Sequence, residues 1–153
     1  MTIRTHPTAW LAATLFACAA VSHLSASAAA PPAAVAAESV KVTVTYTGQG
    51  NVDQTHQLWI WLFDTPDIGP GAMPVAQLSL AQNGGAVTFS DVSAPKVWIA
   101  VAYDEKGGST GEGPPASGSP IGVYTAGTPA PAPVTPGAPG EVLFSFNDSL
   151  RMP

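Results

Sequence analysis

Hydrophobic and polar residues alternate with a period of two along much of the chain, which is typical of β-strands with one buried face. In residues 39–46 the valines and the tyrosine fall on one face, and the lysine and threonines fall on the other. Residues 96–103 and 141–148 alternate in the same way. Residues 56–63 are apolar on both faces, which predicts a strand in the middle of a sheet.

Two further strands are predicted at residues 75–80 and 86–90, with a short one at 121–124. The first two flank an Asn83-Gly84 step, and such a step between strand-like segments favours a tight hairpin, so we expect these strands to pair directly. From residue 38 onward, no stretch carries apolar residues at helical spacing over three turns without a glycine or proline. The pattern therefore predicts an all-β Greek-key β-sandwich of about seven strands.

One long segment, residues 105–140, interrupts this pattern. Glycine (9) and proline (8) supply 17 of its 36 residues. Loops of this length are usually functional or disordered, so we expect the segment to be a contact surface. Its second half, residues 128–139, has the composition of a polyproline-like spacer with a solvated backbone.

The first 30 residues have the pattern of a secretory signal peptide. Arg4 precedes an apolar stretch at residues 10–21, and Ala26, Ser27 and Ala28 fit a small-x-small cleavage site. The apolar stretch is shorter than the roughly 20 residues that a transmembrane helix needs. We therefore predict a periplasmic or secreted protein without a transmembrane segment, an Ala/Pro tether at 31–37 and one domain at 38–153.

The single cysteine, Cys18, lies inside this leader. The sequence LFAC around it resembles the lipobox of bacterial lipoproteins, although Phe16 stands where that pattern has a small or β-branched residue. We interpret Cys18 as an ordinary residue of the leader, with a lipid anchor as the alternative. In either case the mature domain has neither a disulfide framework nor a cysteine-built metal site.

The composition excludes one class of partner. Of the 153 residues, 46% are hydrophobic and 10% are charged, and the formal net charge is −5 with a pI near 4.8. Without the leader, four basic residues face ten acidic ones, which gives −6. A chain with no basic stripe cannot neutralise phosphates, so we expect no nucleic-acid partner.

The stretch VAYDEKGGSTGEGPPASGSPIGVY, with the lead-in GGAVTFSDVSAPKVWIAVAYD, resembles bacterial exported domains of the transthyretin-like or carboxypeptidase-regulatory-like type. The resemblance covers roughly residues 38–148 and implies a β-sandwich fold. In such families a loop of the form hDxDGNGxxDxGDPxGxY follows the strand and is suited to calcium. Asp104 matches its first acidic ligand, and residues 118–124 match its closing turn.

The rest of the calcium pattern is missing. The second acidic position falls near Lys106, and Ser119 stands where the resemblance implies an aspartate. Calcium takes six to eight oxygen ligands. The candidate carboxylates of this stretch, Asp104, Glu105 and Glu112, are too few. We therefore interpret the loop as a relative that has lost the ion, and predict neither a metal nor a cofactor.

Catalysis is also disfavoured. Outside the leader the chain has one histidine, His56, with no GxSxG motif and no cysteine to activate. Asp64 and Asp67 lie in a turn around Pro66, where aspartates commonly bond their own backbone. We predict a protein that is not an enzyme, with a hydrolase as a weaker alternative.

Aromatic residues are the better functional candidates. If Leu58, Ile60 and Leu62 face the core, then Trp59, Trp61, Phe63 and Trp98 lie on the opposite face of the sheet, and Tyr124 is a further candidate binding residue. Such a stripe could bind a sugar or a peptide, or the proline-rich loop could cover it; we favour a covered or core stripe. The sequence predicts an exported binding or accessory module for a protein, peptide or carbohydrate. The alternative is an assembly component in which residues 40–46 or 142–147 pair with another chain.

Overall fold

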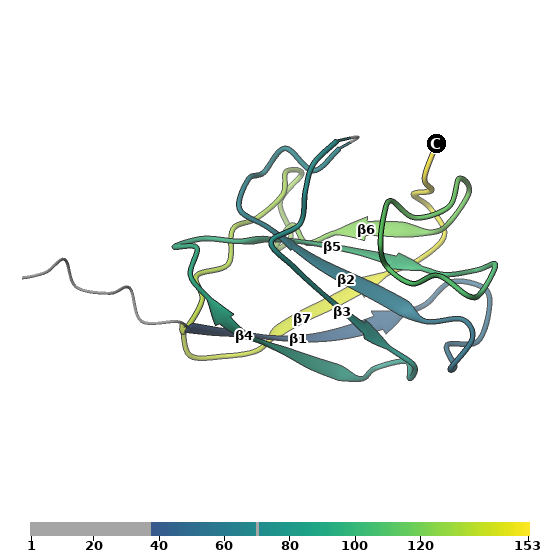
Figure 1. Ribbon diagram of the computed structural model, residues 1–153, viewed down its shortest axis with the longest axis horizontal. Coiled ribbons are helices and arrows are strands. Elements are labelled where there is room, and N and C mark those ends of the chain that lie inside the picture. The colour runs from purple at the N-terminus through teal and green to yellow at the C-terminus, as the bar shows by residue number, and fades with distance from the viewer. Residues whose placement is uncertain (1–37, 70) are drawn as a thin grey trace, which may run out of the picture. The chain divides into compact units, whose positions relative to one another are not determined.

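The computed structural model describes residues 38–69 and 71–153 (Figure 1). The predicted signal peptide, its cysteine and the tether lie outside these residues. The described part is all-β, and none of its segments is a helix that could cross a membrane. Its seven strands are β1 (Glu38–Tyr46), β2 (Leu58–Phe63), β3 (Ala76–Leu80), β4 (Ala86–Val92), β5 (Trp98–Tyr103), β6 (Ile121–Val123) and β7 (Val142–Phe146).

The strands form two sheets, with the orders β4-β1-β7 and β3-β2-β5-β6. All neighbours are antiparallel except β1 and β7, which are parallel. The predicted central position of β2 is confirmed, because β2 lies between β3 and β5. Strand β1 is also central, so the idea that residues 40–46 offer an exposed edge for another chain is wrong. Only β7 of the two proposed strands lies at an edge.

A single apolar core joins the two sheets. It contains the inward residues of β1 together with Leu58, Ile60 and Leu62 of β2, and these three leucine and isoleucine side chains have no exposed surface. Complete burial of one such side chain stabilises the fold by about 1.5–3 kcal/mol. The predicted alternation in β2 is thus confirmed, with the aliphatic residues inside and the tryptophans on the outer face.

The predicted hairpin across Asn83-Gly84 is wrong. Strand β3 pairs with β2 in one sheet, and β4 pairs with β1 in the other. The Asn83 side chain explains the difference, because it bonds to the backbone of Tyr46 at the end of β1. Asn83 Oδ1 accepts from Tyr46 N at 2.8 Å, and Asn83 Nδ2 donates to Tyr46 O at 2.7 Å. Gly84 N then donates to Val44 O, so the segment crosses from one sheet to the other.

The proline-rich segment 128–139 is docked on the sheets, so the predicted solvated spacer is also wrong. Val134 exchanges two backbone hydrogen bonds with Val97, at 2.9 and 2.7 Å, and its side chain packs against the core. Gly137 N donates to Ser39 O. The prolines remove backbone donors from this segment, but Val134 keeps both its N–H and an apolar side chain.

Strands β6 and β7 come close together across the space between the two sheets. A Cβ atom placed on Gly122 would lie 2.8 Å from Phe146 Cβ and 3.1 Å from Phe144 Cζ. Only glycine fits this position, because such distances are shorter than ordinary van der Waals contacts between carbon atoms. Because Gly122 of β6 has no side chain, the two phenylalanines of β7 can fill the space between the sheets.

Candidate binding surface

The outer face of the sheet β3-β2-β5-β6 gathers most of the candidate residues. The pairing register aligns residues from neighbouring strands in rows across this face, because directly paired residues point to the same side. We call this surface the aromatic face. Its rows are Ser79, Trp59, Ala102 and Ile121; then Gln77, Trp61, Ala100 and Val123; then Phe63 and Trp98.

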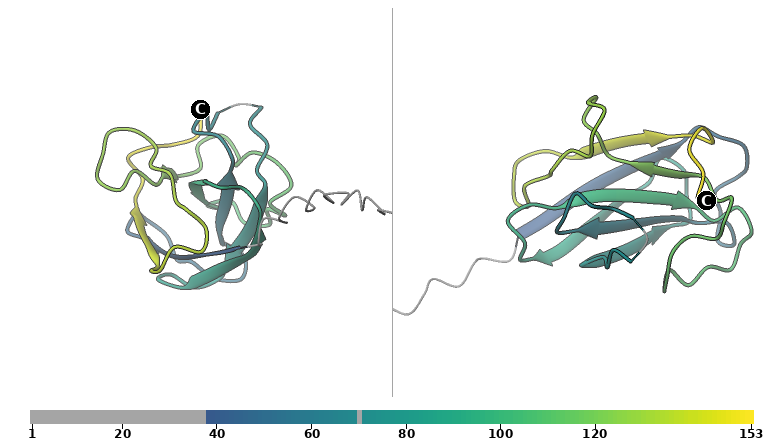
Figure 2. Two further views of the ribbon diagram at one scale, coloured as in Figure 1. Left: turned by 90° about the vertical axis from the view of Figure 1, so that its left-hand side faces the viewer. Right: turned by 90° about the horizontal axis from the view of Figure 1, so that it is seen from above.

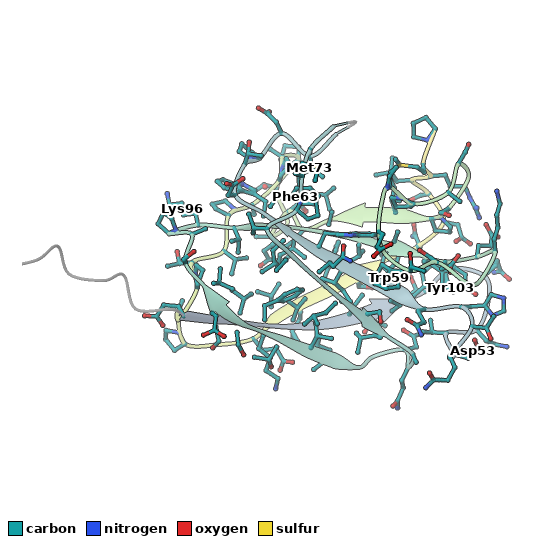
Figure 3. All side chains as sticks on the ribbon, in the orientation of Figure 1. Asp53, Trp59, Phe63, Met73, Lys96 and Tyr103 are labelled. Atoms are coloured by element: carbon teal, nitrogen blue, oxygen red, sulfur yellow. The ribbon has the colours of Figure 1, made fainter. Side chains whose placement is uncertain are left out.

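The indole rings of Trp59 and Trp61 stack on the aromatic face, with centroids 6.5 Å apart and an angle of 25° between their planes. Ala100 and Ala102 are paired with Trp61 and Trp59 in the register, so a floor of small side chains lies beside the rings. Figure 3 shows Trp59 and Phe63 well separated along β2. Trp59, Trp61 and Phe63 therefore share one face of the sheet, as the alternating pattern predicts.

Loops cover part of this surface. Trp61 is 6% exposed and Phe63 is 7% exposed, whereas Trp59 and Trp98 are half-buried. Ile68 and Ala72, from the loop after β2, pack against the outer-face cluster. At the other end, Gly111 lies against Trp59: a Cβ on this glycine would be 2.2 Å from Trp59 Cζ3. The expectation of a covered stripe is thus correct for Trp61 and Phe63, but the residues that pack there come from the loop after β2, whereas the long glycine- and proline-rich segment contacts Trp59 through Gly111.

Trp59 has an unusual polar atom. Its Nε1 is buried and has no hydrogen-bond acceptor within the described part of the chain. An indole N–H normally finds a partner when it is buried. Leaving a buried donor without one costs about 1–3 kcal/mol. This N–H group can therefore form a hydrogen bond that the protein itself does not provide.

Tyr124 is separated from the three tryptophans. Tyr124 directly follows β6, two residues after Gly122. Because side chains alternate between the two sides of a strand, it points to the inner side, as position 122 does. There it contacts Phe144 edge-on, with ring centroids 6.0 Å apart and an interplanar angle of 79°. The structure thus brings Trp59, Trp61 and Trp98 onto one face and places Tyr124 between the sheets.

The three candidate ion ligands have different surroundings. Asp104 is 8% exposed, and its carboxylate accepts from Gly107 N at 3.0 Å and from Ser109 N at 2.7 Å. Glu105 accepts from Arg151 Nη1 at 2.8 Å, while Glu112 is exposed. Among residues 38–69 and 71–153, no three histidine, cysteine or acidic side chains gather in a way that could hold a metal ion. Asp104 instead organises the start of the loop that reaches Trp59.

Replacing Asp104 with alanine is expected to loosen this loop. The change removes the acceptors of two backbone N–H groups, and we expect it to lower the free energy of unfolding by about 1–3 kcal/mol. Lys106 lies within the turn that Asp104 holds, so trypsin should cut after Lys106 faster in the variant. Glu112→Ala is the control, because Glu112 is exposed and its change should leave both measurements unaltered. An unchanged cleavage rate in Asp104→Ala would contradict the assigned role.

A second feature is a shallow depression of about 360 Å³ at the loop end of the domain, lined by Gln49, Gly50, Asn51, Asp53, His56, Tyr103 and Glu105. Figure 3 shows Asp53 and Tyr103 at this end. The sequence did not predict this site, because its lining comes from two separate loops and one strand end. The only local signal is the spacing of Asp53 and His56, which fits a turn.

Within the depression, Asp53 and His56 form a pair. Asp53 Oδ1 lies 3.2 Å from His56 Nδ1 and also accepts from the backbone N–H groups of His56 and Thr55, each at 2.8 Å. These backbone hydrogen bonds lower the pKa of the Asp53 carboxyl group. Burial raises the pKa of the Tyr103 hydroxyl, which donates to Asn51 O at 3.0 Å. The Asp53–His56 pair therefore stabilises the turn that forms one wall of the depression.

Comparison with protein family models, with curated proteins and with solved structures finds no match to this chain. The resemblance to transthyretin-like domains therefore stays a prediction. Functional proposals depend on the geometry of the aromatic face and of the loops around it.

Proposed function

We propose that this protein is an exported, non-catalytic binding module of the Greek-key β-sandwich type, and that the aromatic face is its contact surface. The observation that carries this proposal is the stacked pair Trp59 and Trp61 beside a floor of alanines. Large aromatic side chains provide much contact area with little loss of conformational entropy on binding. A transthyretin-like ancestry is compatible with this fold, but it does not indicate which ligand binds.

A non-catalytic role is supported by the depression around His56. A histidine base activates a nucleophile through a hydrogen bond, as in Ser-His-Asp triads. The described lining of the depression contains no serine, threonine or cysteine side chain. Asp53 orients the imidazole ring, but its Oδ1 is also bonded to two backbone N–H groups of the turn. The pair thus fits a structural role at the loop end.

The proposal can be tested by nuclear magnetic resonance of the indole N–H groups. The tryptophans are labelled with ¹⁵N, assigned by single Trp→Phe variants, and titrated with two classes of probe. These are cellohexaose and a neutral extended peptide rich in leucine and phenylalanine. We expect saturable shifts in the Trp59 and Trp61 signals with at least one class. If neither class moves these signals, in the wild type or after Gly111→Ala, the aromatic face is not a binding surface.

The second candidate function, an assembly component, is favoured by one observation on β7. This strand lies at the edge of its sheet, and Leu143 on it is 71% exposed. An edge strand with a free backbone can pair with another chain. If the protein assembles in this way, light scattering after size-exclusion chromatography should detect oligomers without added ligand, and Leu143→Lys should dissociate them. A monomeric wild type favours the binding module instead.

A further inference from the structure

The loop between β5 and β6 provides the cover over one end of the aromatic face. In Figures 1 and 2 this loop projects beyond the strands at the end where β5 finishes. Its contact with the sheet is made by Gly111, whose φ of +76° is a backbone conformation that favours glycine. A side chain at this position would overlap the six-membered ring of Trp59.

This contact is weakly held. Within the described residues, no hydrogen bond joins residues 110–117 to the strands of the sheet. The fixed points lie at the two ends of the segment, where Asp104 bonds Gly107 and Ser109, and where Gly118 bonds Met152. The segment between these points can therefore lift from Trp59 without breaking a hydrogen bond to the sheet.

The surroundings of the two indole rings indicate what could replace the loop. Ser79 is paired with Trp59, and Gln77 is paired with Trp61, so a hydroxyl and an amide border the rings on the β3 side. None of the residues in the rows of the aromatic face carries a charge. Such a surface has no partner for a charged ligand, and it favours a neutral ligand with a flat apolar side and hydroxyl groups at its rim.

We propose that the aromatic face is a carbohydrate-binding site for neutral β-linked pyranose chains, and that residues 109–117 form a lid over its Trp59 end in the free protein. This inference rests on the proposed function and gives it a ligand class. A pyranose with equatorial hydroxyls presents its C–H groups to an aromatic ring and its hydroxyls to the side. There the sugar hydroxyls bond to Gln77, to Ser79 and to the unpaired Nε1–H of Trp59. An extended peptide also offers backbone carbonyl and N–H groups to these three side chains, so a peptide is the competing ligand that the titrations must exclude.

The first test opens the lid. Gly111→Ala places a methyl group against the Trp59 ring, and Gly108→Ala is the matched control. Gly108 also has a positive φ, +83°, but a Cβ there would meet nothing within 4 Å. We expect acrylamide to quench tryptophan fluorescence more strongly in Gly111→Ala than in Gly108→Ala. If the lid is closed about 90% of the time, opening it should strengthen cellohexaose binding about tenfold.

The second test removes the indole donor. Trp59→Phe keeps an aromatic ring in place but deletes the N–H group, and we expect cellohexaose binding to weaken about fivefold. Tyr124→Phe is the control, because it also deletes one polar hydrogen-bonding group from an aromatic residue, and Tyr124 packs against Phe144 between the sheets, away from the aromatic face. Isothermal titration calorimetry of both variants measures this difference, and it does not require the lid variant to fold.

The outcomes separate the two proposals. If the peptide probe shifts the Trp59 and Trp61 signals and cellohexaose does not, the binding module stands and the carbohydrate inference is wrong. If cellohexaose binds equally to the wild type, Gly111→Ala and Gly108→Ala, the site stands but residues 109–117 are not a lid. If neither probe binds to any of these proteins, both proposals are overturned.

Discussion

Replacing Asn83 with glycine is expected to lower the free energy of unfolding by about 2–4 kcal/mol. If Asn83 served only to form a tight turn, glycine would replace it well, since glycine adopts turn conformations easily. The structure assigns it another role. Its side chain accepts from Tyr46 N and donates to Tyr46 O, which extends the hydrogen-bond ladder at the end of β1. Both backbone groups of Tyr46 lose these partners in the variant.

The control for this prediction is Gln82→Gly at the neighbouring position. Gln82 is exposed, and only its backbone carbonyl takes part in the turn, where it accepts from Gly85 N. Added chain entropy in the unfolded state should then lower its stability by about 0.5–1 kcal/mol. Urea denaturation gives both values from the midpoint and the slope. Equal losses in the two variants would mean that the Tyr46 contacts contribute nothing beyond the turn.

The positions of the strands could be predicted from the sequence, but not all of their pairing partners could. Strand positions were predictable from the period of two that burial of one face imposes on β1, and from the continuous apolar segment of β2, which is buried on both faces. The partner of β3 was not, because an Asn-Gly step fits both a hairpin and a crossing between sheets. The contact that decides between them joins Asn83 to Tyr46, 37 residues earlier. No local pattern contains that information.

The aromatic face could also be predicted only in part. Its tryptophans on β2 and β5 were predictable from alternation, and the structure places them together. Its cover was not, because residues 105–118 have no periodicity, and Gly111 meets Trp59 through a contact between distant parts of the chain. Composition was also misleading for residues 128–139. A high proline content suggested a solvated spacer, but the backbone N–H groups of Ala132, Val134 and Gly137 bond this segment to the rest of the domain.

A second large loss of stability is expected from Gly122→Val. The new Cβ would lie 2.8 Å from Phe146 Cβ, and that atom is attached directly to the backbone of β7. Strand β7 is bonded along its length to β1, so it cannot move aside alone. Overpacking of this kind typically costs about 1–3 kcal/mol, and the two additional methyl groups of valine should bring the loss to the upper end of that range or above it.

The sign of this effect distinguishes packing from strand propensity. Valine favours β-strands over glycine, so local preference alone predicts that Gly122→Val stabilises the protein. Gly69→Val is the control for a general effect of adding the side chain, because a Cβ at Gly69 would meet nothing within 4 Å. We expect urea denaturation to give a loss of at least about 3 kcal/mol at position 122 and less than about 1 kcal/mol at position 69. A stabilised Gly122→Val protein would mean that Gly122 of β6 does not pack against Phe146 of β7.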